Sequence, residues 1–187
     1  MPYASRGRFP AVVLYAYGKD IPVGQFAEVA RNLCGHDIVV SCVENLNAEN
    51  LRKAVHELQA HPKVDRNHIG VWARGYGAKE MPRMNLPAGH FNFVILTIDH
   101  PDERLFPEML ASVLTDDLPT FLGFRSVSGD WKRVAPLMLT GFQSAPHQIV
   151  MIDEPPCAVE GIGADQDWID CLSGDFVNNI SAWLDSN

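Results

Sequence analysis

Two kinds of apolar segment alternate along this chain, and the alternation constrains its fold more than any other feature. Short, continuous, β-prone runs suit strands that are covered on both faces of a sheet. Between them lie segments whose apolar residues recur at helical spacing. The expected strands span residues 10–16, 36–42, 68–73, 91–98, 119–124 and 148–152, and the helical stripes span residues 26–33, 51–58, 105–113, 131–138 and 176–184.

Strands that alternate with helices predict βαβ units and a parallel sheet. We therefore expect an α/β protein of three layers, αβα, with a mostly parallel six-stranded sheet. No repeat, low-complexity tract or linker interrupts the pattern, so residues 1–187 are interpreted as a single domain. Local signals support the boundaries: Gly35 ends the first helix, Asn47 caps the second and Pro62 stops it. Proline and glycine at positions 82, 87 and 89 predict a short helix or irregular segment after Gly77.

Composition restricts the partners. Lys and Arg number 15 against 23 Asp and Glu, so the net charge is −8. That excess of carboxylates argues against nucleic acid or an anionic membrane as the main partner. No run of about 18 apolar residues predicts a membrane span, and no signal peptide is visible. The four cysteines form no C-x-x-C motif, which favours reduced thiols and a cytoplasmic location.

In parallel α/β sheets, binding and catalytic residues lie beyond the carboxyl ends of the strands. The loops to consider therefore begin near Tyr17, Arg74, Asp99, Arg125 and Asp153.

The most informative segment ends in one of these loops. It spans residues 64–78, which read VDRNHIGVWARGYGA. This segment resembles the approach to the nucleophile elbow of the α/β-hydrolase superfamily, especially its small dienelactone-hydrolase-like and prolyl-oligopeptidase-like members. There a V-D-x-x-x-I-G-V-x-G strand leads into H-S-Y-G-G, and the tight turn projects a serine hydroxyl over the sheet. Residues 9–18, 118–124 and 148–152 also resemble strands of that family. The resemblance implies a minimal α/β-hydrolase fold that lacks the N-terminal antiparallel strands.

The catalytic residues of that family are largely missing. Gly75 stands in the place of the serine, Arg74 in that of the preceding histidine, and Gly77 is retained. The family's histidine follows its last strand, but the corresponding loop here contains no imidazole. The resemblance leaves Asp130 as a candidate for the triad acid; an Asp in a Ser-Gly-Asp loop is also an ordinary turn residue. A hydrolase of this kind needs a nucleophile, a base and an orienting carboxylate, so we expect no serine-hydrolase activity.

Other residues offer alternative chemistry. Cys157 lies in the loop expected to face the elbow, where a nearby cation such as Arg74 would activate its thiolate. Asp99 and His100, which follow the fourth expected strand, can act as an acid–base pair. A half-buried inert cysteine and a simple turn before Pro101 are the competing interpretations. The histidine spacing matches no zinc site, and neither a dinucleotide fingerprint nor a P-loop is present, so we expect no cofactor and no metal.

A shortened elbow still offers free N–H groups at Tyr76 and Gly77 beside Arg74, and Tyr17 is expected to line the same crevice. These groups predict a site for a small or anionic molecule. The competing interpretation is that Arg74 fills the space of a lost active site. Two sheet edges, at residues 38–42 and 148–152, need covering or pairing, which suggests a homodimer.

Three hypotheses follow. The first is a non-catalytic α/β-hydrolase-fold protein that acts in binding or assembly. The second is an active hydrolase of a small ester, thioester or lactone with a rearranged site. The third is a flavodoxin-like domain, from which a hydrolase fold is distinguished by an extra C-terminal strand in the sheet.

Overall fold

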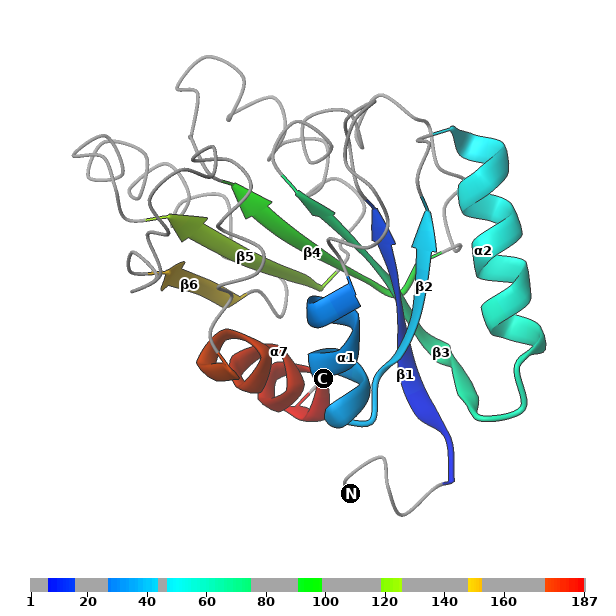
Figure 1. Ribbon diagram of the computed structural model, residues 1–187, viewed down its shortest axis with the longest axis horizontal. Helices are drawn as coiled ribbons and strands as arrows, with labels where there is room; N and C mark the ends of the chain where they lie inside the picture. Colours follow the sequence, from blue (N-terminus) through cyan, green and yellow to red (C-terminus); the bar gives the residue numbers. More distant parts are fainter. Residues whose placement is uncertain are drawn as a thin grey trace.

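The structure is a computed structural model, and it describes residues 7–15, 27–43, 47–74, 91–98, 119–125, 148–152 and 174–186. Strands and helices alternate in the first half of the chain, as the apolar pattern predicts (Figure 1). The elements are β1 (Phe9–Tyr15), α1 (Ala27–Gly35), β2 (Val39–Val43), α2 (Ala48–Ala60), β3 (Val64–Arg74), β4 (Phe93–Ile98), β5 (Thr120–Arg125), β6 (Gln148–Ile152) and α7 (Gly174–Ser186).

The six strands form one sheet in the order β2-β1-β3-β4-β5-β6. Every neighbouring pair is parallel. Each of the six predicted strands is therefore present among the described residues, and their parallel direction is confirmed. The order reverses at β1, which has β2 on one side and β3 on the other. A sixth strand beyond β5 is the feature that separates a hydrolase-like sheet from a flavodoxin-like one, and β6 occupies that place.

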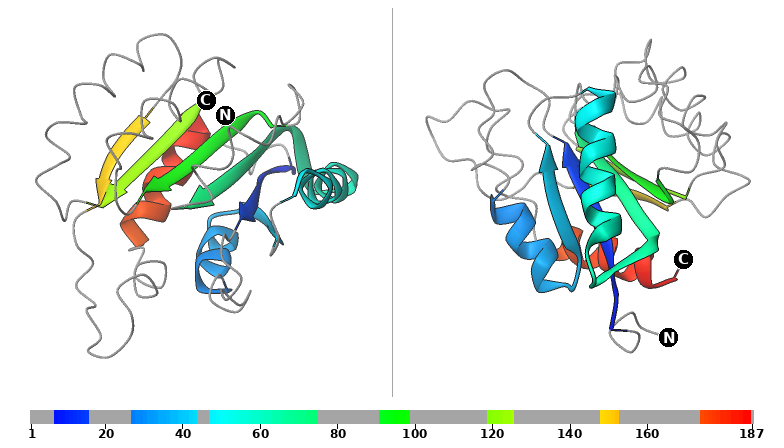
Figure 2. Two further views of the ribbon diagram at one scale, coloured as in Figure 1. Left: turned by 90° about the horizontal axis from the view of Figure 1, so that it is seen from above. Right: turned by 90° about the vertical axis from the view of Figure 1, so that its right-hand side faces the viewer.

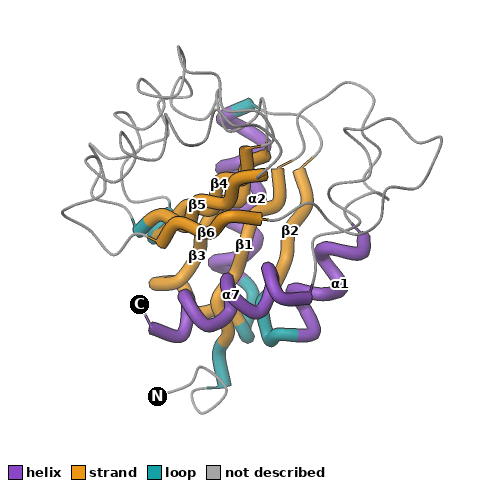
Figure 3. The backbone as a smooth tube through the Cα atoms, turned by 90° about the vertical axis from the view of Figure 1, so that its left-hand side faces the viewer, coloured by secondary structure: helices purple, strands orange, loops and turns teal. Residues whose placement is uncertain are grey.

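Helices cover both faces of the sheet, which gives the predicted αβα layers. Helix α2 lies against one face, over β1, β2 and β3. Helices α1 and α7 lie side by side on the other face (Figures 2 and 3). Because successive strand residues point to opposite faces, each strand contributes alternate residues to two cores. The strand residues that face α2 are buried and small or branched: Ala11, Val13, Ile69, Val71 and Ala73.

The core beneath α1 and α7 is richer in aromatic rings. Trp183 of α7 lies edge-on to Phe93, with ring centroids 5.8 Å apart and planes at 85°. Its ring also lies 5.5 Å from that of Phe121. Gly70 lies next to Phe93 across the β3–β4 pair. A Cβ atom at Gly70 would overlap the Phe93 ring, so only glycine fits there without movement of the ring.

Local signals at the helix ends are confirmed where the structure describes them. The side chain of Asn47 accepts a 2.7 Å hydrogen bond from the amide of Asn50, as an N-cap does. Helix α2 ends at Ala60, just before Pro62, and α1 ends at Gly35. The prediction that the second strand begins at His36 is wrong. Residues 36–38 form a turn in which the amides of His36 and Ile38 both bond the carbonyl of Leu33, and Asp37 takes a positive φ of 61°.

Some predicted elements lie outside the described residues. These are the helical stripes at 105–113 and 131–138 and the irregular segment after Gly77. Among the described helices, none combines the length and the apolar character that a membrane crossing requires.

Candidate functional site

The carboxyl ends of the central strands come level with one another at one edge of the sheet, where the arrowheads point in Figure 1. Tyr15, the last residue of β1, pairs with Ala73, and Arg74, the last residue of β3, pairs with Thr97. Ile98 at the end of β4 pairs with Phe124 of β5. The chain therefore leaves four adjacent strands at nearly the same height, which is the geometry that collects loop residues into a shared site.

The predicted site residues follow these strand ends in the sequence. Arg74 is the last residue of β3, so position 75 directly follows the end of that strand in the sequence. The other predicted residues lie outside the described part of the chain: Tyr17, Gly75, Tyr76, Gly77, Asp99, His100, Asp130 and Cys157. Their positions relative to one another stay predictions. The topology supplies their starting points, because the strands that precede them, β1, β3, β4, β5 and β6, are consecutive neighbours in the sheet.

A buried polar contact supports this edge from beneath. The indole Nε1–H of Trp72 donates a 3.0 Å hydrogen bond to Oγ1 of Thr97, and both residues are almost completely buried. Thr97 is the register partner of Arg74, so the contact lies directly below the end of β3. A buried indole N–H needs such a partner, because an unpaired one costs about 1–3 kcal/mol. The contact fixes β3 against β4 where the loop after Arg74 begins.

Sequence reasoning missed this contact. Trp72 reads as one more apolar strand residue, and Thr97 as a β-branched residue within the next strand. A usable signal was present, since a tryptophan in a fully buried strand requires an acceptor and Thr97 is the hydroxyl nearest the end of the neighbouring run.

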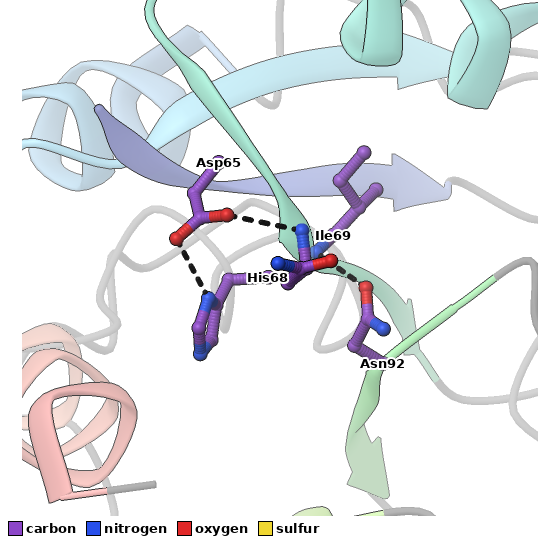
Figure 4. Close-up of polar contacts among 5 residues, drawn as sticks. Asp65, His68, Ile69 and Asn92 are labelled. Carbon is purple, nitrogen blue, oxygen red and sulfur yellow. Dashed lines mark hydrogen bonds and ion pairs between the residues drawn. The ribbon is translucent and has the colours of Figure 1, made fainter.

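A second polar cluster lies at the opposite end of β3 (Figure 4). Nδ1 of His68 lies 3.0 Å from Oδ2 of Asp65, and Oδ1 of Asp65 accepts a bond from the amide of Asn67. The backbone N–H of Ile69 donates a 3.1 Å hydrogen bond to Oδ1 of Asn92. The backbone N–H of Asn92 donates a 2.7 Å hydrogen bond to the Ile69 carbonyl. These bonds hold the irregular start of β3, where the β1–β3 register shifts between Phe9 and Ala11.

The Asp65–His68 pair resembles part of a catalytic triad in its chemistry but not in its location. An ionised carboxylate only accepts hydrogen bonds, so Nδ1 of His68 is the donor of this bond. The pair is partly exposed, at 24% for His68 and 14% for Asp65. However, His68 lies six residues before Arg74 along β3, about 20 Å in an extended strand. It is therefore too far away to activate a nucleophile at the carboxyl edge.

Two cysteines lie in the described part of the chain, and Cys42 is one residue before the carboxyl end of β2, where Val43 pairs with Tyr15. Cys34 on α1 and Cys42 on β2 are both free and exposed. Although Cys42 is exposed as a residue, protein atoms partly surround its sulfur. This partial burial, and to a lesser extent the neighbouring Cys34, raises the pKa of the Cys42 thiol. A raised pKa lowers the thiolate fraction at neutral pH, so Cys42 is a weaker nucleophile than an ordinary cysteine. Within the described ranges, no three His, Cys, Asp or Glu side chains come together as metal ligands would.

Comparison with known proteins identifies the fold. No family model matches the sequence, and no curated protein matches it either. Solved structures do match over nearly the whole chain. A protein assigned as a carboxylesterase from Lactobacillus plantarum WCFS1 superposes with a TM-score of 0.66 at 14% identity, covering 96% of this chain and 90% of that one.

Two further structures agree. Dienelactone hydrolase from Anabaena variabilis gives a TM-score of 0.56 at 17% identity, covering 98% of this chain and 87% of that one. The esterase domain of a Rhodothermus marinus protein gives 0.55 at 12% identity, covering 100% and 88%. At these identities the likeness concerns the fold. The chain has an α/β-hydrolase-like fold, as the resemblance of residues 64–78 implies.

Proposed function

We propose that this protein uses its α/β-hydrolase-like fold to bind a ligand or partner and has no serine-hydrolase activity. The observation that carries this proposal is the end of β3. The strand finishes at Arg74, and the next residue, which takes the place of the family's nucleophile, is Gly75. A glycine has no side-chain oxygen or sulfur with which to attack an ester carbonyl.

The sequence beyond β6 adds support. In the family, the base that accepts the nucleophile's proton follows the last strand of the sheet. Here no histidine occurs after His147, which precedes β6. The described pair Asp65–His68 does not replace it, because it lies at the amino end of β3. Asp130 is then a carboxylate without an imidazole to orient, so loss of both nucleophile and base argues for loss of the reaction.

The ligand that suits the carboxyl edge is a small anionic molecule, such as a carboxylate or phosphate. Arg74 would supply the positive charge, and the backbone N–H groups of Tyr76 and Gly77 would supply hydrogen bonds. Tyr17 would line the same site. The free cysteines among the described residues suit a reducing compartment, and we place the protein in the cytoplasm.

A second candidate function is hydrolysis of a small ester, thioester or lactone through a rearranged site. It is favoured by the proteins of similar fold, which are described as an esterase, a carboxylesterase and a dienelactone hydrolase. Cys157 would then act as the nucleophile, or Asp99 and His100 would hold the attacking water. Fold alone does not carry activity, so this candidate depends on those three residues.

Hydrolysis of p-nitrophenyl acetate by the purified protein separates the two candidates. We expect no turnover above that of the Cys157→Ala and His100→Ala variants, because the loop that carries Cys157 contains no histidine to act as its base and position 75 supplies no nucleophile. Turnover that either substitution abolishes would contradict the first candidate and establish the second. Cys42→Ala is the matched control, since an exposed thiol on β2 can react slowly with an activated ester without being part of a site.

Isothermal titration with inorganic phosphate and with acetate tests the binding part of the proposal. Arg74→Gln is expected to weaken binding at least about tenfold, because a charge-assisted hydrogen bond is lost. Arg52→Gln is the control, since Arg52 lies on α2 and its Nε–H bonds the carbonyl of Ala48. Equal affinity for phosphate and acetate in the wild type and in both variants would show that Arg74 is not part of the binding site.

A further inference from the structure

The outer edge of β2 is a surface that the proposed function does not use. β2 is the terminal strand of the sheet, and within the described residues no strand pairs with its side away from β1 (Figure 1). Cys42 is exposed at this edge, and Val39, Val40 and Ser41 are half-buried. Helices α1 and α2 lie on the two faces beside it. The amide and carbonyl groups along such an edge are suited to pairing with another strand.

The residues of β2 do nothing to discourage that pairing. Soluble proteins usually protect an edge strand with lysine, proline, a bulge or an inward-pointing charge. The β2 sequence is VVSCV, which contains none of these residues, and its register against β1 is regular over all five pairs. Three of its five residues are valines, which favour extended backbone.

Charge indicates which partner fits. The whole chain carries −8, so two copies repel unless their contact surface is free of carboxylates. β2 is uncharged throughout, so two copies can meet there without placing like charges opposite one another. An antiparallel pair of identical strands is also self-complementary about a two-fold axis, so this edge needs no second sequence.

We propose that β2 is a homodimer interface, in which it pairs antiparallel with β2 of a second copy and joins two sheets into one. With the axis at Ser41, the middle residue, Cys42 lies opposite Val40 of the partner subunit. The two Cys42 side chains then lie on the same face as diagonal neighbours, about 7–8 Å apart. This inference concerns assembly alone, and it holds whether or not the carboxyl edge binds an anion.

Paired charge variants test the interface by sedimentation velocity over a range of protein concentrations. The wild type is expected to dimerise. Cys42→Lys and Cys42→Glu are each expected to raise the dissociation constant at least about tenfold, because each places like charges across the axis. Asn179→Lys is the control, since Asn179 is exposed and lies on α7 rather than at the β2 edge. It is expected to dimerise like the wild type.

Mixing the two Cys42 variants distinguishes an interface from a general loss of structure. Lysine from one copy and glutamate from the other attract across the axis, so the mixture is expected to regain dimer that neither variant forms alone. Amide exchange of residues 38–43 is also expected to slow as the wild-type concentration rises. A wild type that stays monomeric, a dimer that both variants keep unchanged, or exchange in β2 that ignores concentration would each overturn the proposal.

Discussion

The two faces of the sheet differ in the side chains that pack between the strands and the helices. Beneath α1 and α7, Trp183 contacts the rings of Phe93 and Phe121, so one large side chain connects a helix to two strands. Beneath α2 the strand residues are alanine, valine and isoleucine, and the helix contributes Leu51, Ala54, Val55 and Leu58. The first face depends on the fit of a few rings, whereas the second distributes its contacts over many small groups.

This contrast indicates where substitutions should destabilise the fold most. Ring packing of the first kind fixes neighbours in a single arrangement, so a change of volume there has no simple route to relaxation. Small aliphatic contacts are individually weak, and the helix they hold also depends on its own ends. Variants placed on each face should therefore lose stability for different reasons and by different amounts.

Trp183→Ala is expected to have the largest effect. It removes both aromatic contacts and leaves a cavity beneath α7, at a cost of about 3–5 kcal/mol. The measurement is the free energy of unfolding in urea. Leu58→Ala is the matched truncation on the α2 face, where about 2–5 kcal/mol is expected. If Leu58→Ala proves more costly than Trp183→Ala, the contrast between the faces is wrong.

Gly70→Ala tests the fit of the rings from the strand side. The new methyl group would overlap the Phe93 ring, which Trp183 holds edge-on, so we expect a loss of about 1–3 kcal/mol or more. Chemical denaturation of Gly70→Ala, Phe93→Leu and the double variant measures the coupling. The double variant should be less destabilised than the sum of the two single changes, because leucine vacates the space. Simple additivity would show that Phe93 is not what restricts position 70.

Much of this architecture was predictable, because burial imposes a pattern on the sequence. Strands covered on both faces must be continuously apolar, and so their number and parallel direction could be inferred. The Asn47 cap was predictable for a local reason, because a side-chain oxygen at the start of a helix can accept a hydrogen bond from a backbone amide of the first turn. The start of β2 was predicted three residues too early, because Asp37 adopts a positive φ in a turn that the neighbouring residue types do not predict.

Contacts between distant strands were much harder to predict. The Trp72–Thr97 bond joins residues 25 positions apart, and its existence depends on the register of β3 against β4. Gly70 and Phe93 likewise meet only through that register. The glycine at position 75, on which the proposed loss of activity rests, is visible in the sequence as a residue type, whereas contacts between loop side chains cannot be read from residue types. The residue type at a single position therefore supported a functional prediction, whereas the spacing of residues along the chain did not predict contacts between strands.

Asn47→Ala should have the smallest of the three effects, and it tests the α2 face through the helix rather than through its packing. The substitution removes the acceptor for the Asn50 amide while it leaves the buried residues of α2 unchanged. Loss of an N-cap costs about 1 kcal/mol. Urea unfolding should detect this change, and Asn47→Asp should retain the stability, since a carboxylate accepts the same bond and favours the helix N-terminus. Lys53→Ala, an exposed change within α2, is the control and is expected to have almost no effect. A loss larger than that of Leu58→Ala would mean that α2 depends on its cap more than on that buried side chain, which would contradict the role assigned to packing on this face.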